Sequence, residues 1–303
     1  LFAVTSLAFG LPAALAQNDV PAVTGNVRVD KLLGQMTLAE KMSLIHDGRE
    51  DPRDYQGQAG YVGGVPRLGI PGLRLADGPP GVLTRHPSQA ETATMGVAAT
   101  FDLDLARRNG EVIGREARAL GIDVSLQPFI HLARDLAMRR LYNTFGEDPL
   151  LTGAMAAATI EGIQSQHVMA VAKHFIGYDT TATDVWIDEQ TLHEVYLPPF
   201  EAAVREADAQ SIMICYGALN GIPCTSDKCI CRDLPAQWGF TGHIVDDCPG
   251  IAGLLGHRAA HNIEEAIALG INAGIDRQFY DFIGDVPNQN AGQERFEQML
   301  LKL

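Results

Sequence analysis

Apolar residues recur along this chain with two different periods. In some segments they fall three or four positions apart, the spacing of one face of a helix. Thr37 and Glu40 form a capping box at the start of the first such segment, and the helical spacing continues through Ile45. The next runs from Leu103 to Leu120 and is followed by Gly121, a residue type that commonly ends helices. Both segments predict helices.

Between the helical segments lie short runs that are apolar on both faces. Such runs, separated by helix-length segments, are typical of parallel strands covered by helices. The sequence therefore predicts an α/β fold. A (β/α)8 barrel of the TIM type needs eight such strands, and six runs can be identified, so two strands are not accounted for. The six are Leu73–Ala76, Val124–Ile130, Val168–Phe175, Ser211–Tyr216, His243–Asp246 and Gly270–Ile275.

Polar or charged side chains follow most of these runs. In a barrel the C-terminal ends of the strands converge on one mouth, so residues far apart in the sequence would meet there. We expect an active site at that mouth. Loops after strands are polar in most proteins, so the pattern alone does not identify a catalytic residue. The side chains concerned are Asp77, Arg134, Lys173, His174, Tyr216 and Asp247.

Length, composition and charge indicate one large domain and exclude two classes of binding partner. The 303 residues suit one large domain, since α/β barrels of roughly 200 to 250 residues are ordinary. Hydrophobic residues make up 46% and charged residues 20%, as in a soluble globular protein. The formal net charge of -14 repels phosphate backbones and anionic lipids, and no run of Lys and Arg offsets it. We therefore expect neither a nucleic acid nor a membrane partner.

The first sixteen residues read as a targeting segment. Leu1–Ala16 carries no charge and ends in Ala14-Leu15-Ala16, the small-x-small pattern that signal peptidases cut. We expect 1–16 to be a signal-peptide remnant, 17–303 the enzyme domain, and the protein to be secreted or periplasmic. The alternative is a buried N-terminal helix, since the segment is shorter than the about 20 apolar residues of a membrane span.

Five cysteines lie in the last third of the chain. Their odd number leaves at least one thiol free, and we expect free thiols or one local disulfide near Cys224. Cys229 and Cys231 are separated by one residue and so lack the two-residue gap of zinc knuckles, and no pair of histidines at metal spacing accompanies them. We therefore expect no metal site and no cofactor. The cysteines are Cys215, Cys224, Cys229, Cys231 and Cys248.

Five motifs occur in order between Leu32 and Asp276. They read Met-Thr-Leu-Ala-Glu-Lys at 36–41, Leu-Ala-Asp-Gly-Pro-Pro-Gly-Val at 75–82, Phe-Gly-Glu-Asp-Pro at 145–149, Lys-His-Phe at 173–175 and Trp-Gly-Phe-Thr-Gly-His-Ile-Val-Asp-Asp-Cys at 238–248. Each motif alone is weak, but five in register are specific. Through them the chain resembles glycoside hydrolase family 3. The resemblance implies a barrel domain and a retaining exo-β-glycosidase.

The resemblance places the family's nucleophile at Asp247. A carboxylate suits this role because the transition state is oxocarbenium-like and positive, and attack on one face of the sugar gives a covalent glycosyl-enzyme. Asp246 precedes it in a strand, and successive strand residues point to opposite sides. The two acids therefore cannot both face one sugar. Local sequence alone also fits a helix N-cap at Asp247.

The resemblance also implies a set of sugar-binding residues. Asp77 matches the acceptor for hydroxyls at the non-reducing end, and a charged acceptor makes the strongest such bonds. By itself His174 fits a core histidine, but two basic groups rarely end a buried strand without a ligand, so Lys173 favours a site. In the resemblance, Arg140, Lys173 and His174 match positions that donate to ring hydroxyls, and Met213 and Tyr216 match residues lining the same subsite.

The chain departs from the family at the general acid/base, which retaining chemistry requires. Many members carry a Glu on a second α/β sandwich domain, and this chain stops before such a domain. Single-domain relatives use an Asp-x-His dyad, where this chain reads Asp184-Val185-Trp186. Around Arg140 the chain also has Arg139 and Asn143 in place of the family's Gly and Glu, and Tyr216-Gly217 in place of Tyr-Asn.

Glu147-Asp148-Pro149 invites a ligand role, but we interpret it as structural. Acids before a Pro at the first helical position start a helix and stabilise the positive end of its dipole. The helix predicted here is the Ala-rich segment Leu150–Ile163.

The leading hypothesis is a β-glucosidase that removes terminal β-D-glucosyl residues from a small saccharide or glycoside. A β-xylosidase is the alternative, because Gly221-Ile222-Pro223-Cys224 resembles that branch of the family as much. A truncated sugar-binding relic would keep Asp77, Lys173 and His174 with little turnover. An unrelated barrel aldolase or isomerase would need a metal or Lys173 at its mouth. The sequence leaves the oligomeric state unknown.

Overall fold

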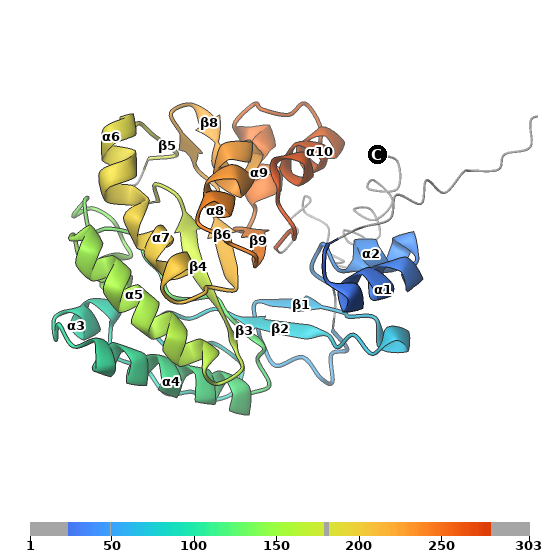
Figure 1. The fold of residues 1–303 in the computed structure, drawn as a ribbon, viewed down its shortest axis with the longest axis horizontal. Coiled ribbons are helices and arrows are strands. Elements are labelled where there is room, and N and C mark those ends of the chain that lie inside the picture. The colour runs from blue at the N-terminus through green and yellow to red at the C-terminus, as the bar shows by residue number, and fades with distance from the viewer. Residues whose placement is uncertain (1–23, 49, 179–181, 280–303) are drawn as a thin grey trace, which may run out of the picture. The chain divides into compact units, whose positions relative to one another are not determined.

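The computed structural model describes residues 24–48, 50–178 and 182–279 (Figure 1). The predicted signal segment 1–16 lies outside these residues. The chain divides into two compact units, one ending at Thr37 and one beginning at Leu38. In the first unit, helix α1 (Val27–Gln35) begins where the side chain of Asn26 accepts hydrogen bonds from the backbone N–H groups of Arg28 and Val29.

The second unit is built on a curled six-stranded sheet in the order β1-β2-β3-β4-β6-β9. Strand β1 is antiparallel to β2, and every other neighbouring pair is parallel. The predicted α/β class is thus confirmed, and the sheet is parallel except at β1. The strands are β1 (Gly60–Val62), β2 (Leu73–Ala76), β3 (Val124–Ser125), β4 (Met169–Phe175), β6 (Ser211–Ile214) and β9 (His243–Asp246).

Helices cover the outer face of this sheet. Figure 1 shows α4 and α5 side by side, with α7 next to α5, and all three pack near β3 and β4. The three predicted helices are confirmed as α2, α4 and α5. The helices are α2 (Leu38–Ser43), α3 (Thr94–Ala98), α4 (Leu103–Ala119), α5 (Pro149–Gln164), α6 (Glu189–Thr191), α7 (Pro198–Arg205), α8 (Leu234–Gln237), α9 (Gly250–Gly256) and α10 (Ile263–Ala273).

Short elements fill the connections. A three-stranded sheet is formed by β5 (Asp184–Val185), β7 (Ala218–Leu219) and β8 (Ile222–Pro223). The single turns are η1 (Pro66–Leu68), η2 (Leu141–Asn143), η3 (Leu192–Tyr196), η4 (Cys224–Ser226) and η5 (Cys229–Asp233).

One predicted strand is wrong. Most of Gly270–Ile275 belongs to the last turns of α10, and the helix ends at Gly274 with φ +119°. A short apolar run has the same composition in a buried strand as in a buried helix, so the sequence pattern could not separate them. Strand β3 is also shorter than the predicted Val124–Ile130, because the N–H of Gln127 donates to the carbonyl of Ser125 and Pro128 has no N–H to donate to a ladder.

Backbone hydrogen bonds continue beyond β9 toward β1. The N–H of Arg277 donates to the carbonyl of Ile244 at 3.1 Å, and the N–H of Gln278 donates to the carbonyl of Ile45 at 2.8 Å. The N–H of Gly48 then donates to the carbonyl of Tyr61, in β1, at 2.6 Å. Residues 45–48 and 276–278 therefore connect the two edges of the curled sheet.

The structural interpretation of Glu147-Asp148-Pro149 is confirmed. Asp148 is the N-cap of α5, its carboxylate accepts from the N–H of Leu151 at 2.7 Å, and Pro149 opens the helix. We predict that Asp148→Ala lowers the free energy of unfolding by about 1 kcal/mol, because one end-of-helix N–H loses its acceptor. Chemical denaturation checks this. The exposed Glu147→Ala is the matched control, with a change below about 0.5 kcal/mol, and equal losses in both variants would contradict the capping role.

All five cysteines are free thiols, so the disulfide that we considered near Cys224 does not form. Cys215, Cys224 and Cys231 are buried, and the thiol of Cys215 donates to the carbonyl of Ile176 at 3.1 Å. Within the described residues, no helix has the length and apolarity to cross a membrane.

Candidate functional site

The C-terminal ends of three strands bring two carboxylates and two basic side chains together. Asp77 follows β2, Lys173 and His174 lie near the end of β4, and Asp247 follows β9. The Nζ of Lys173 donates to Oδ1 of Asp77 at 2.7 Å. The Nε2 of His174 lies 3.4 Å from Oδ2 of Asp247. Residues separated by as many as 170 positions thus form one cluster, as expected where the carboxyl ends of parallel strands meet at one edge of a sheet.

The Lys173–Asp77 pair joins a buried cation to an accessible anion. The side chain of Lys173 is 3% exposed and that of Asp77 is 45% exposed. Burial raises the pKa of Asp77, but the positive charges of Lys173 and Arg140 outweigh it and leave the pKa below its usual value. Asp77 is therefore a charged acceptor that solvent or a ligand can reach.

Asp247 occupies a less solvated environment. Its side chain is 16% exposed, and burial raises its pKa to about 6 against the opposing effect of Lys173. One of its oxygens accepts from the backbone N–H of Cys248 at 2.9 Å, and the other faces His174. A partly desolvated carboxylate that is ionised near neutral pH has the properties of a nucleophile.

Asp246, its neighbour in the chain, has a different role. The residue is fully buried, and its carboxylate accepts from the backbone N–H groups of Ile251 at 3.0 Å and Phe279 at 2.5 Å. These bonds tie the start of α9 and the segment after α10 to the end of β9. The two adjacent acids do not share an environment, as the alternation of strand side chains predicted.

Aromatic rings line the cluster, and most of them were not predicted from the sequence. The ring of Phe129 lies 5.3 Å from that of His174, and the guanidinium of Arg140 lies 4.4 Å above Phe129. The ring of Tyr178 lies 5.1 Å from that of His174, and its hydroxyl accepts a hydrogen bond from that of Tyr216. Phe129 lies within the predicted run Val124–Ile130, where an apolar ring indicates only the core, and Tyr178 lies in a connection that no periodicity describes.

Arg140 and Tyr216 border a cavity of about 450 Å³ next to the cluster. The Nε of Arg140 donates to Oδ1 of Asn143 at 3.1 Å. Asn143 stands where the family usually has Glu, so its amide binds Arg140 in place of a carboxylate. Tyr178 and His257 also line the cavity, and His257 contacts the backbone carbonyl of Tyr216 at 3.0 Å. This space could accept the part of a ligand that lies beyond Asp247.

Two residues from the sequence analysis make no described contact with the carboxylates of the cluster, although Met213 is the register partner of Lys173. Met213 is 1% exposed and packs in the inner core with Leu75, Val171 and Val245. Its strand alternates, so Met213 faces inward while Ile212 and Ile214 belong to the core beneath the helices. Arg134 stacks 5.4 Å above the ring of Tyr196. The described contacts join neither residue to Asp77 or Asp247.

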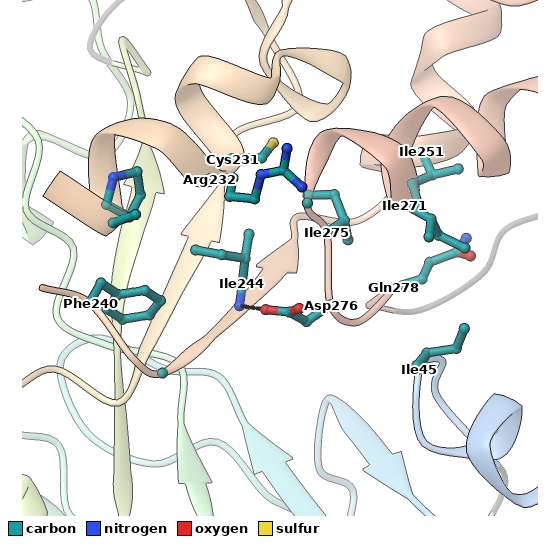
Figure 2. Close-up of a pocket in the computed structure, with 14 residues that line it drawn as sticks. Ile45, Cys231, Arg232, Phe240, Ile244, Ile251, Ile271, Ile275, Asp276 and Gln278 are labelled. Carbon is teal, nitrogen blue, oxygen red and sulfur yellow. Dashed lines mark hydrogen bonds between the residues drawn. The ribbon is translucent and has the colours of Figure 1, made fainter. Parts of the chain in front are cut away.

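A second cavity of about 450 Å³ lies near the amino end of β9 (Figure 2). Figure 2 shows Ile244, Ile275 and Phe240 around it, and the carboxylate of Asp276 accepting from the N–H of Ile244 at 2.8 Å. None of the predicted site residues lines it. Ligands of parallel α/β sheets bind at the carboxyl ends of the strands, which favours the Asp247 cluster as the site.

No three His, Cys, Asp or Glu side chains among the described residues are grouped so that they could hold a metal ion.

The curled parallel sheet and its carboxylates at the strand ends define an α/β enzyme domain. The family described as "Glycosyl hydrolase family 3 N terminal domain" matches residues 29–281. The chain therefore belongs to glycoside hydrolase family 3, which confirms the resemblance found in the sequence motifs.

Two relatives carry different activities in their names. A "Beta-glucosidase" of Rhizobium radiobacter is 33% identical over 261 residues, which are 82% of this chain and 29% of the relative. A "Beta-xylosidase" of Formosa agariphila is 34% identical over 270 residues, which are 82% of this chain and 35% of the relative. The chain thus spans about a third of the length of these relatives.

Solved structures share the fold. DesR, a β-glucosidase from Streptomyces venezuelae in complex with D-glucose, has a TM-score of 0.74 and 37% identity, over 86% of this chain and 32% of its own. β-Glucosidase 3B from Thermotoga neapolitana in complex with glucose has a TM-score of 0.76 and 29% identity, over 91% of this chain and 40% of its own.

Proposed function

We propose that this domain carries the nucleophile and the sugar-binding residues of a retaining exo-β-glycosidase that hydrolyses terminal non-reducing β-D-glucosyl residues. The observation that carries the proposal is the position of Asp247, a partly buried carboxylate beside the Lys173–Asp77 pair and His174. As part of the same proposal, the curled sheet and the segments 45–48 and 276–278 form the (β/α)8 barrel of the family.

The chemistry proceeds in two displacements. An oxygen of Asp247 attacks the anomeric carbon, the bond from that carbon to the glycosidic oxygen breaks, and the departing oxygen takes up a proton from a general acid. Water then attacks the same carbon from the vacated face, its proton goes to the conjugate base, and Asp247 leaves as a carboxylate. Two inversions retain the configuration of the sugar.

Asp77 is suited to binding rather than to proton transfer. A general acid must be protonated at the working pH, whereas Lys173 and Arg140 hold the pKa of Asp77 below its usual value. Its charged carboxylate would accept hydrogen bonds from sugar hydroxyls, while the guanidinium of Arg140 supplies donors nearby. The acid/base is consequently another group.

Glucose is the favoured sugar because β-glucosidases, two of them bound to glucose, are prominent among the relatives and solved structures. Xylose is the alternative, supported by the β-xylosidase relative. Export remains part of the proposal and rests on the sequence of Leu1–Ala16.

The test compares the chain with its Asp247→Ala variant on nitrophenyl and dinitrophenyl β-glucosides and β-xylosides. Dinitrophenolate leaves without a proton, whereas nitrophenolate benefits from one. Release from both leaving groups, lost in the variant, would support a complete glycosidase site, and release from dinitrophenyl substrates alone would support a nucleophile without its acid. Release from neither would overturn the proposal in favour of a sugar-binding relic. The exposed Asp54→Ala is the control.

A further inference from the structure

His131 lies behind His174, on the side away from Asp247. It follows Ile130 beyond β3, and the N–H of Ile130 donates to the carbonyl of Lys173 at 2.9 Å. The Nε2 of His131 accepts from the backbone N–H of His174 at 2.8 Å. His131 is 3% exposed, and its ring stacks on that of His174 with a centroid distance of 5.5 Å and an interplanar angle of 16°.

The protonation of His131 follows from these contacts. Burial, with Arg140 and Lys173 nearby, lowers its pKa well below the usual value, so the ring is neutral. A neutral imidazole has one N–H and one lone pair. Because Nε2 accepts the backbone N–H of His174, the single proton of His131 lies on Nδ1.

His174 is then left with one consistent tautomer. It is also neutral, since burial and then Lys173 lower its pKa. Its Nδ1 lies 3.4 Å from Nε2 of His131, and its Nε2 lies 3.4 Å from Oδ2 of Asp247. A proton on Nδ1 of His174 would compete with the backbone N–H of His174 for the lone pair on Nε2 of His131. The unprotonated Nε2 of His174 would then face the negative charge of the Asp247 carboxylate. A proton on Nε2 points at Asp247 and avoids both conflicts.

We propose that His131 is a positioning residue that holds His174 in the Nε2–H tautomer, with that N–H directed at the carboxylate of Asp247. This inference rests on the proposed function, in which Asp247 is the nucleophile. A neutral donor at this place orients the carboxylate for attack. It also stabilises the carboxylate when Asp247 leaves the glycosyl-enzyme, which is the step where negative charge returns to its oxygens.

The same division of roles occurs at metal sites, where the partner of the second ring nitrogen fixes the tautomer and orientation of a histidine. In this chain His131 accepts the backbone N–H of His174, and its Nε2 lone pair is then no longer available to a proton on Nδ1 of His174. His131 therefore differs from a residue that merely fills space, because an apolar side chain of equal size would pack beside Phe129 but could not accept the N–H of His174.

Two variants and one spectroscopic measurement test this role. His131→Leu removes the acceptor and keeps the bulk, whereas His131→Gln restores an acceptor through its amide oxygen. We expect His131→Leu to lower kcat by about tenfold or more, with a smaller change in KM, and His131→Gln to recover most of the loss. The exposed His261→Leu is the control and should match the parent chain.

Nitrogen-15 NMR of the histidines gives a readout that does not depend on turnover, with the His174 signals identified by their loss in His174→Gln. We expect protonated Nε2 and unprotonated Nδ1 at His174 in the parent chain, and a mixture of tautomers in His131→Leu. A parent His174 protonated on Nδ1, or a folded His131→Leu with unchanged kcat and tautomer, would overturn the inference. An inactive parent chain would refute the proposed function alone, and the NMR result would still decide the role of His131. If His131→Leu does not fold, the parent spectrum and His131→Gln decide it.

Discussion

Asp247→Asn is expected to abolish hydrolysis while making the folded domain more stable at neutral pH. The amide has almost the same shape but cannot attack the anomeric carbon, so kcat should fall by at least about 10⁴-fold. In the parent chain the same requirement predicts that activity falls as the pH drops through about 6, because the protonated carboxyl of Asp247 is not a nucleophile. Steady-state kinetics on a dinitrophenyl glycoside between pH 4 and 8 measures both effects.

The gain in stability follows from the raised pKa. Burial moves the pKa of Asp247 from 3.8 to about 6. Below about pH 4 the folded and unfolded chains both hold the proton, so the carboxyl then has no effect. As the pH rises from 4 to 6 the unfolded chain ionises first, and the parent protein loses stability. Above pH 6 the loss is constant at up to about 3 kcal/mol.

Asn carries no charge and escapes this loss. Asp247→Asn should therefore be more stable than the parent chain at pH 8 and similar to it at pH 4. Urea denaturation at the two pH values measures the difference. Asp54→Asn removes an exposed carboxylate and serves as the control for net charge. A gain that is equal at both pH values would contradict the assignment of the raised pKa to Asp247.

The fold was predictable where local periodicity and burial agree. The strand runs that became β2, β4, β6 and β9 are apolar on both faces, and the segment of α4 combines helical spacing with a glycine at its end. Strand β1 was missed because Gly60–Val62 lies in a stretch rich in Gly and Pro. In α10 the composition matches a strand, and only tertiary packing decides the outcome.

One rule predicted part of the site, namely that site residues end or directly follow the apolar strands of a parallel sheet. Asp77, Lys173 and Asp247 were found because they end or follow apolar runs that converge in space. His131 follows Ile130 in the same way, but the residue predicted after that run was Arg134, which lies four positions beyond its end. Tyr178 lies three residues beyond β4, in a connection that no periodicity describes. The tautomer of His174 depends on distances between residues from three strands, which no local pattern contains.

Lys173→Met should impair activity far more than it impairs folding. Met nearly matches the length of the Lys side chain but carries no charge, so Asp77 loses its hydrogen-bonded partner and its pKa rises. The pKa of Asp247 rises as well, since Lys173 is the strongest influence that lowers it. The acid limb of the pH-rate profile should therefore move to higher pH, and kcat/KM at pH 6 should fall by about 100-fold or more.

Stability should change little, within about 1 kcal/mol. Losing one member of a buried ion pair is harmful when the other charge stays buried, but Asp77 is 45% exposed and water can solvate it. Removing the ammonium also removes the penalty of burying Lys173. Lys228→Met, which breaks an exposed contact with Asp233 at 3.8 Å, is the control and should leave the pH profile unchanged.

A double-mutant cycle with Asp77→Asn separates the two uses of the pair. The interaction energy between Lys173 and Asp77 is measured once in urea denaturation and once in kcat/KM. A coupling that is larger in kcat/KM would mean that the buried ammonium of Lys173 serves mainly to lower the pKa values of Asp77 and Asp247. A coupling that is larger in stability, with an unmoved acid limb, would contradict this and leave the pair as a structural ion pair.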